Sequence, residues 1–151
     1  MPSRVVIKLG GGLITDKGSM KKFDPDSVER VADSISSIVG MGVPVVIVHG
    51  AGSFGHLLAK EWSISKGVDQ KIAKEQRMIV EEIRSDMREL NGLVIDRLSD
   101  SGLQSEGLPP SEWAIGTGSG FKGDITNFER VVEAPIPITF GDVVDTNDQQ
   151  E

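Results

Sequence analysis

The stretch that decides the fold is Val43-Pro44-Val45-Val46-Ile47-Val48, followed at once by His49-Gly50-Ala51-Gly52-Ser53-Phe54-Gly55-His56. The first part is a β-branched run that is apolar on both faces, which is typical of a strand in a covered parallel sheet. The second part is a glycine-rich turn at the carboxyl end of that strand. Open α/β sheets bind ligands at this end of their strands, so the turn is a candidate anion-binding loop.

The same arrangement occurs earlier in the chain. The run Arg4-Val5-Val6-Ile7-Lys8-Leu9 predicts a buried strand, and it leads directly into Gly10-Gly11-Gly12. Glycine lets backbone N–H groups approach a phosphate closely. Two such loops at one edge of a sheet suit a reaction between two phosphorylated molecules.

Helical patterns separate the strand patterns. Asp24-Pro25-Asp26-Ser27 predicts a helix start with Asp24 as N-cap and Pro25 at the first helical position. A second, longer helix is predicted over residues 69–99, and a further strand over residues 135–140. Residues 116–124 are rich in glycine and predict a loop or hairpin. This order predicts an α/β three-layer sandwich with a mostly parallel central sheet and right-handed crossovers.

Composition narrows the class of protein. The chain has 151 residues, of which 38% are hydrophobic, which suits one ordinary globular domain with its own core. A formal charge of −7 argues against a nucleic-acid binder. Cysteine is absent, which excludes thiolate metal sites. No apolar run reaches the roughly 18 residues of a membrane span, and no signal-peptide pattern is present. We therefore expect a cytoplasmic protein that does not associate with membranes.

Several side chains near the loops are candidates for chemistry. Lys8 and Lys17 flank the first loop, and lysines at such a position can neutralise charge during phosphoryl transfer. The spacing fits a second interpretation equally well, in which Lys8 only ends a strand and Lys17 is a solvated surface lysine. His56 follows the second loop at the predicted first turn of a helix. It is either a hydrogen-bond donor to a phosphate or a surface histidine that caps its own loop. His49, which closes a buried strand, is predicted to be structural.

Other patterns carry less information. The sequence contains no Gly-x-x-x-x-Gly-Lys-Ser/Thr, and residues 50–55 match Gly-x-Gly-x-x-Gly without the acidic residue that a dinucleotide site needs. Met78, Ile79, Ile83 and Met87 form a stripe at helical spacing. Such a stripe is more often core than ligand pocket, but a soft apolar pocket beside a phosphate loop also fits a prenyl tail.

Three segments resemble the motifs of one family. The segment 8–17 resembles the opening motif of the amino-acid kinases, and the segment 49–56 is similar to that of the branch containing isopentenyl phosphate kinases and fosfomycin-type kinases. The segment 140–144, Phe-Gly-Asp-Val-Val, is similar to the third motif, a Gly-Asp turn. The three occur in the family's order and span nearly the whole chain.

The resemblance implies transfer of the γ-phosphoryl group of ATP to isopentenyl phosphate, giving isopentenyl diphosphate for isoprenoid biosynthesis. It also implies roles for individual residues: Lys8, Gly10, Gly11 and Gly12 at the transferring phosphate, Lys17 at the transition state, Ala51 and Gly52 as backbone contacts to acceptor and ATP, His56 on the acceptor phosphate, Gly141 against the substrate, and Ile83 and Met87 at its apolar tail. Mg²⁺ is expected to bridge the β- and γ-phosphates.

The chain departs from the family pattern in two ways. Gly12 stands where the family usually has serine. The sequence also stops soon after the Gly-Asp motif, whereas the family's nucleotide-binding segment comes from the half that follows. The resemblance therefore implies that residues 1–151 are the amino-terminal, phosphate-acceptor part of an amino-acid kinase domain whose nucleotide-binding half is missing here. Three functions remain open: an isopentenyl phosphate kinase that needs a nucleotide-binding half, in the same or a separate chain; a fosfomycin-type phosphonate kinase; and a non-catalytic module that binds phosphorylated ligands. The resemblance further implies a homodimer.

Overall fold

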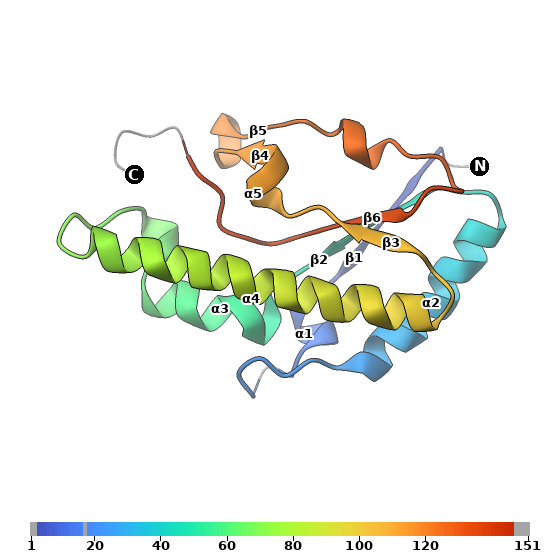
Figure 1. Ribbon diagram of the computed structural model, residues 1–151, viewed down its shortest axis with the longest axis horizontal. Helices are drawn as coiled ribbons and strands as arrows, with labels where there is room; N and C mark the ends of the chain where they lie inside the picture. Colours follow the sequence, from blue (N-terminus) through green and yellow to red (C-terminus); the bar gives the residue numbers. More distant parts are fainter. Residues whose placement is uncertain (1–2, 17, 147–151) are drawn as a thin grey trace.

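The computed structural model describes residues 3–16 and 18–146, and a parallel four-stranded sheet lies at its centre. The strand order is β1-β2-β6-β3, and every neighbouring pair is parallel (Figure 1). The strands are β1 (Val5–Leu9), β2 (Val45–His49), β6 (Ile136–Phe140) and β3 (Ser105–Gly107). The predicted parallel sheet is confirmed.

Four helices follow the first two strands. They are α1 (Gly11–Ile14), α2 (Pro25–Gly40), α3 (Gly52–Glu61) and α4 (Ala73–Asp100). A short η1 (Ile64–Lys66) connects α3 to α4. Between β3 and β6 the chain forms only short elements: α5 (Pro110–Trp113), β4 (Ala114–Ile115), η2 (Gly118–Gly120), β5 (Lys122–Gly123) and η3 (Thr126–Phe128). β4 and β5 pair antiparallel, so the predicted hairpin is confirmed.

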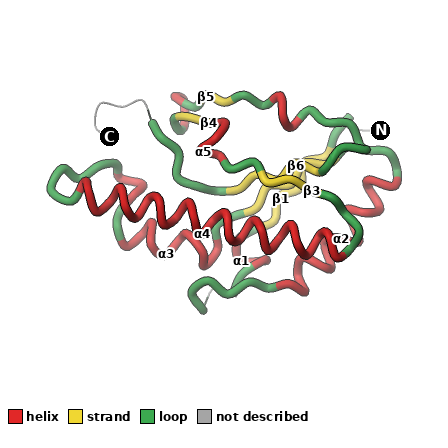
Figure 2. The backbone as a smooth tube through the Cα atoms, in the orientation of Figure 1, coloured by secondary structure: helices red, strands yellow, loops and turns green. Residues whose placement is uncertain are grey.

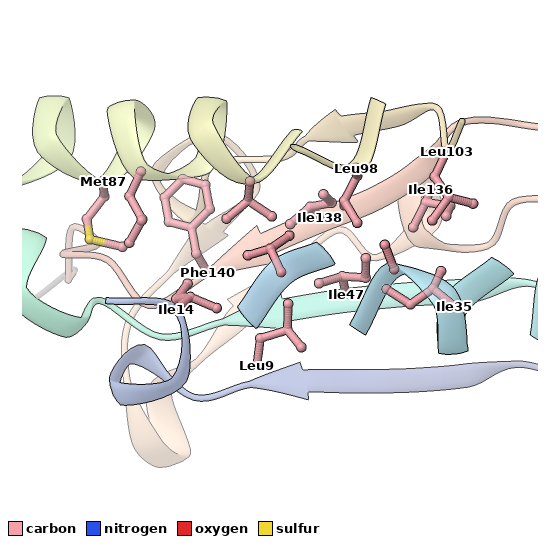
Figure 3. Packing of buried hydrophobic residues seen from close by; sticks show 14 of the residues in the cluster. Leu9, Ile14, Ile35, Ile47, Met87, Leu98, Leu103, Ile136, Ile138 and Phe140 are labelled. Atoms are coloured by element: carbon pink, nitrogen blue, oxygen red, sulfur yellow. The ribbon is translucent and has the colours of Figure 1, made fainter. Parts of the chain in front are cut away.

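The sheet lies between two unequal layers. In Figure 1 and Figure 2, the helices α2, α3 and α4 lie on one side of the sheet, and the segment from α5 to η3 runs along the other side. The helical side carries the main core. Apolar side chains of β1, β2 and β6 meet those of the helices there (Figure 3). No helix among the described residues is long and apolar enough to cross a membrane.

The spacing of apolar residues on α4 explains why this helix covers the sheet. Ile83, Met87, Leu90, Val94 and Leu98 follow one another at intervals of three or four, and all five are buried. The helix begins at Ala73, four residues later than predicted, because residues 69–72 form a turn in which the amide of Ile72 donates to the carbonyl of Asp69 (3.0 Å).

The start of α2 is as predicted. Asp24 is the N-cap, and its carboxylate accepts hydrogen bonds from the amide of Ser27 (3.2 Å) and from its hydroxyl (2.8 Å). Pro25 occupies the first turn, where a backbone N–H would have no intrahelical acceptor, so the absence of this group in proline costs no hydrogen bond.

β3 was not predicted from the sequence. Its three residues, Ser105-Glu106-Gly107, are neither β-branched nor alternating. They form a strand because β6 offers a free edge, and the register pairs Ser105 with Ile136 and Gly107 with Ile138. Tertiary pairing, rather than local propensity, makes this segment extended.

The strand register aligns the ends of three strands. Leu9 pairs with His49, and His49 pairs with Phe140, so Gly10, Gly50 and Gly141 follow at one edge of the sheet. The two loops that begin at Gly10 and Gly50 touch through their backbones. A Cβ on Gly50 would lie 2.7 Å from the amide nitrogen of Gly11. Gly52, at φ +50°, would place a Cβ 2.7 Å from the carbonyl oxygen of Gly11. Only glycine permits this approach.

His49 lies beneath the loops as a structural residue, which confirms the interpretation from the sequence. Its side chain is 1% exposed and stacks on Phe140, with ring centroids 5.1 Å apart. Nδ1 lies 2.9 Å from the carbonyl oxygen of Gly50, which only accepts, so Nδ1 carries the proton. Nε2 lies 3.2 Å from Oδ1 of Asn91, so with the proton on Nδ1 this contact is a hydrogen bond when the side-chain amide of Asn91 is turned to donate its NH2. Burial lowers the pKa of His49, while the hydrogen bonds to Gly50 and Asn91 act in the opposite direction.

The pKa of His49 predicts a pH dependence of stability. Its pKa is about 6.5 in the unfolded chain and lower in the folded one, so the unfolded state binds more protons in between. We expect the contribution of His49 to the free energy of unfolding to be fully present above the pKa of the unfolded chain. It should fall as the pH drops from there toward the lower pKa of the folded chain. Urea unfolding at pH 7, 6 and 5 measures it. His49→Gln should remove this component of the pH dependence, whereas His56→Ala should keep it. Equal slopes in the two variants would contradict the assignment.

The contact between the loops predicts the cost of a methyl group at Gly52. We expect Gly42→Ala, at φ +76° with open space around it, to cost about 1–2 kcal/mol from backbone strain alone. Gly52→Ala should cost roughly 1–3 kcal/mol more, because its Cβ also overlaps Gly11 and Thr15. Urea unfolding followed by tryptophan fluorescence compares the two variants. Equal losses would show that the loops separate easily.

Candidate functional site

The candidate site is the edge of the sheet where β1, β2 and β6 end. Backbone hydrogen bonds continue past the strands: the amide of Gly50 donates to the carbonyl of Leu9 (2.9 Å), and that of Gly141 to His49 (3.0 Å). A Cβ on Gly141 would lie 4.0 Å from the amide nitrogen of Ala51. The structure therefore brings together three predicted regions: Gly10 to Gly12, Ala51 with Gly52, and Gly141.

Backbone amides in the second loop are available to a ligand. Helix α3 begins at Gly52, and the first amides of a helix have no intrahelical acceptor. Ser53 donates to the Thr15 hydroxyl, and Phe54 donates to the carbonyl of Ala51. Within residues 3–16 and 18–146, no group accepts from the amides of Ala51 and Gly52. The positive end of the α3 dipole adds to the attraction for an anion here.

Lys8 is the cation of the first loop that the structure leaves available. Its side chain is exposed near the end of β1, and it forms no ion pair with a described residue. Two other lysines nearby are already paired. Lys21 contacts Asp86 (2.9 Å) and Glu89 (2.7 Å), and Lys22 contacts Asp16 (3.4 Å). Lys17, the other predicted cation, lies outside the described residues.

His56 lies one turn further along its helix than predicted. Only Gly50 and Ala51 of the glycine-rich segment form a loop before α3, and Gly52 to Gly55 form the first turn of the helix. His56 is therefore in the second turn, and its side chain is exposed. The prediction of a first-turn position was wrong because Gly52 adopts a positive φ that allows the helix to begin within the loop. The predicted phosphate contact of His56 stays a prediction.

The predicted residues of the apolar tail site are buried. Ile83 is 2% exposed and Met87 fully buried, and both belong to the main core. Met87 packs behind the second loop, where a Cβ on Gly55 would lie 3.0 Å from its sulfur. An open cleft of about 740 Å³, lined by Trp62, Gln76 and others, lies between the end of α3 and the start of α4 and contains none of the predicted site residues.

One buried cation beside the third motif was not among the predicted site residues. Arg84 is 7% exposed, and its Nε donates to the carbonyl of Val143 (3.0 Å) while Nη2 donates to Asp145 (3.0 Å). This hydrogen bond lowers the pKa of Asp145. Arg84 thereby fixes the segment that follows Gly141. The available signal was the presence of Arg84 and Asn91 on the otherwise apolar face of the long helix.

Asp142, the acid of the Gly-Asp turn, is partly removed from water. Burial raises its pKa, while the positive charges of Arg84 and Arg88 oppose the shift. Oδ1 accepts a hydrogen bond from the amide of Val143 (2.8 Å). Oδ2 is buried without a hydrogen-bond partner among the described residues. A buried carboxylate oxygen without a partner is unusual, and its place beside the loops makes this turn part of the candidate site.

The residues present fit the phosphate end of ATP. The open backbone at Gly10, where a Cβ would meet nothing within 4 Å, and the available Lys8 both suit phosphate oxygens. The described part of the chain contains no group of three side chains able to hold a metal ion.

Comparison with known proteins agrees with this geometry. The Amino acid kinase family matches residues 3–150. Isopentenyl phosphate kinase of Methanothermobacter thermautotrophicus is 31% identical over 150 residues, which is 97% of this chain and 56% of that protein. The enzyme of the same name from Methanocaldococcus jannaschii is 27% identical over 147 residues, covering 92% of this chain and 55% of its relative.

Solved structures agree with the sequences. A crystal structure of isopentenyl phosphate kinase superposes with a TM-score of 0.85 at 30% identity, covering 97% of this chain and 60% of the other. The product complex of the Thermoplasma acidophilum enzyme gives a TM-score of 0.79 at 25% identity. The chain thus spans little more than half the length of the relatives it matches, as an amino-terminal part of such a kinase would. On the match over almost its whole length, this chain belongs to the amino acid kinase family.

Proposed function

We propose that this chain supplies the acceptor side of an isopentenyl phosphate kinase, which transfers the γ-phosphoryl group of ATP to isopentenyl phosphate. The observation that carries the proposal is the contact between two glycine loops at the ends of β1 and β2, with His56 on the helix that starts in the second loop. The names and structures of the relatives support the choice of acceptor. No observation favours a phosphonate acceptor.

The chemistry needs positioning and charge neutralisation. An oxygen of the acceptor phosphate attacks the γ-phosphorus while the bond to the β-phosphate oxygen breaks, giving isopentenyl diphosphate and ADP. No general base is required, because the acceptor oxygen is already ionised. Lys8 and the backbone of Gly10, Gly11 and Gly12 would face the transferring group, and magnesium would neutralise charge on the β- and γ-phosphates. Lys17 is proposed to share that role at the transition state.

The second loop would hold the acceptor. The available amides of Ala51 and Gly52 point to anion binding, and His56 would donate a further hydrogen bond to the acceptor phosphate. Gly141 is proposed to line the substrate, because it follows β6 within reach of Ala51. Met87, behind Gly55, and Ile83 are proposed as the core side chains nearest the apolar tail.

The nucleotide would need further chain. Among the described strands, β1 pairs only with β2, so the backbone N–H and C=O groups along its other edge have no strand partner. Such an unpaired edge is a ready template for another strand. We propose that a nucleotide-binding half, in continuation or as a separate polypeptide, completes the enzyme there. Homodimer formation and a cytoplasmic location remain predictions.

Calorimetry tests the acceptor site. We expect the purified chain to bind isopentenyl phosphate, and His56→Ala to weaken binding roughly ten- to a hundredfold, as expected for the loss of a hydrogen bond to a charged group. Lys60→Ala is the matched control, because it removes an exposed positive charge from the same helix, and it should bind like the wild type. Equal weakening in both variants would indicate general electrostatics instead of a phosphate contact by His56.

The same experiment separates the remaining functions. Titration with ATP and magnesium, together with a coupled assay of ADP release, is expected to show no turnover by this chain alone. Acceptor binding without turnover supports the acceptor half. Preference for fosfomycin over isopentenyl phosphate would favour the phosphonate kinase, and binding that no added nucleotide-binding half converts to turnover would favour a non-catalytic module.

A further inference from the structure

One buried hydroxyl joins the two glycine loops. Thr15 follows α1 and is 3% exposed. Its Oγ1 donates to the carbonyl of Gly11 (2.7 Å) and accepts from the amide of Ser53 (3.1 Å). A hydroxyl has one hydrogen and two lone pairs, so both bonds form at once with the correct polarity. A single oxygen atom thus bridges the first loop and the first turn of α3.

Ser53 extends this bridge to a third segment. It is 5% exposed; its Oγ accepts from the amide of Lys22 (3.3 Å), and its carbonyl accepts from the amide of Lys21 (3.2 Å). Lys21 is in turn anchored to α4 through Asp86 and Glu89. The segment 18–22, which follows the predicted catalytic Lys17, is therefore attached to the second loop through Ser53.

The space around Thr15 leaves its hydroxyl little freedom. Gly52 has no room for a side chain, since a Cβ there would overlap Oγ1 of Thr15 and lie 2.8 Å from its Cγ2. Backbone contact sets how close the loops can come, and the Thr15 hydroxyl sets how far apart they can move. The spacing between donor and acceptor phosphates controls the rate of phosphoryl transfer, and displacements near 1 Å are costly.

We propose that Thr15 is a positioning residue that sets the distance between the two phosphate loops. Ser53, which is hydrogen-bonded to Thr15 and to the amides of Lys21 and Lys22, holds the segment that follows Lys17 in place relative to the second loop. The inference rests on the proposed function, because the distance matters to the reaction only if the loops hold the two ends of a phosphoryl transfer. Thr15 itself touches neither phosphate in this scheme. Its effect is on ligands that reach both loops.

The test compares two removals of a buried threonine hydroxyl. Thr15→Val removes the bridging oxygen at constant shape, and Thr15→Ser restores it. Thr139→Val is the matched control, because Thr139 is 8% exposed and its hydroxyl has no partner among the described residues. Two probes are titrated by calorimetry: isopentenyl phosphate, expected at the second loop alone, and inorganic tripolyphosphate, long enough to reach both loops.

We expect Thr15→Val to weaken tripolyphosphate binding about tenfold more than isopentenyl phosphate binding, as for the loss of one buried hydrogen bond. The affinity of Thr15→Ser for each probe should stay within about threefold of the wild-type affinity, and Thr139→Val should bind both probes like the wild type. A general loss of stability would weaken both probes alike. Equal weakening of both probes, or a serine variant as weak as valine, would overturn the proposal.

Hydrogen exchange gives a ligand-free measurement. In the wild type, the amide of Ser53 should exchange more slowly than that of Gly52, which has no described acceptor, and Thr15→Val should abolish the difference. If the amides of Ser53 and Gly52 exchange at the same rate in the wild type, the proposal is overturned, and this comparison does not require the valine variant to fold. If the wild type binds neither anion, the proposed function fails, and the exchange data alone then support or overturn the bridge by Thr15.

Discussion

The structure depends on the backbone contact between the loops that end β1 and β2. Gly11 and Gly52 come so close that neither has room for a side chain. The contact exists because β1 and β2 are neighbours in parallel register, with Leu9 opposite His49. The phosphate contacts of the proposed reaction come from these two loops, from the helix α3 that starts in the second loop, and from the end of β6 beside them. Without this approach, the two loops would form two separate sites.

Helix α4 holds this edge of the sheet in place while leaving it accessible. Its apolar stripe fills the core beneath the loops, and Met87 packs directly behind Gly55. Its polar residues restrain segments that the core does not reach. Arg84 fixes the chain after the Gly-Asp turn, and Asp86 anchors Lys21. The same helix therefore stabilises the fold and arranges the loops around the candidate site.

The site combines a rigid backbone with few side chains, which suits a reaction between two phosphates. Backbone amides and a helix dipole neutralise charge without reorganising during the reaction. Lys8 remains without an ion-pair partner in the described chain, whereas Lys21 and Lys22 are engaged elsewhere. In the proposal, a nucleotide-binding half would extend the sheet at the free edge of β1. Acceptor and nucleotide sites would then meet at one strand.

The sequence by itself determined the parallel α/β class, the two glycine loops and the cap at Asp24, because strand runs, glycine clusters and caps are local patterns. Tertiary structure alone decided what non-local pairing controls. β3 is a strand only because β6 pairs with it, and α3 starts inside the glycine loop, which moves His56 by one turn. The bridge made by Thr15 joins residues 38 positions apart. No local pattern encodes such a bond, since its partners meet only when the strands align.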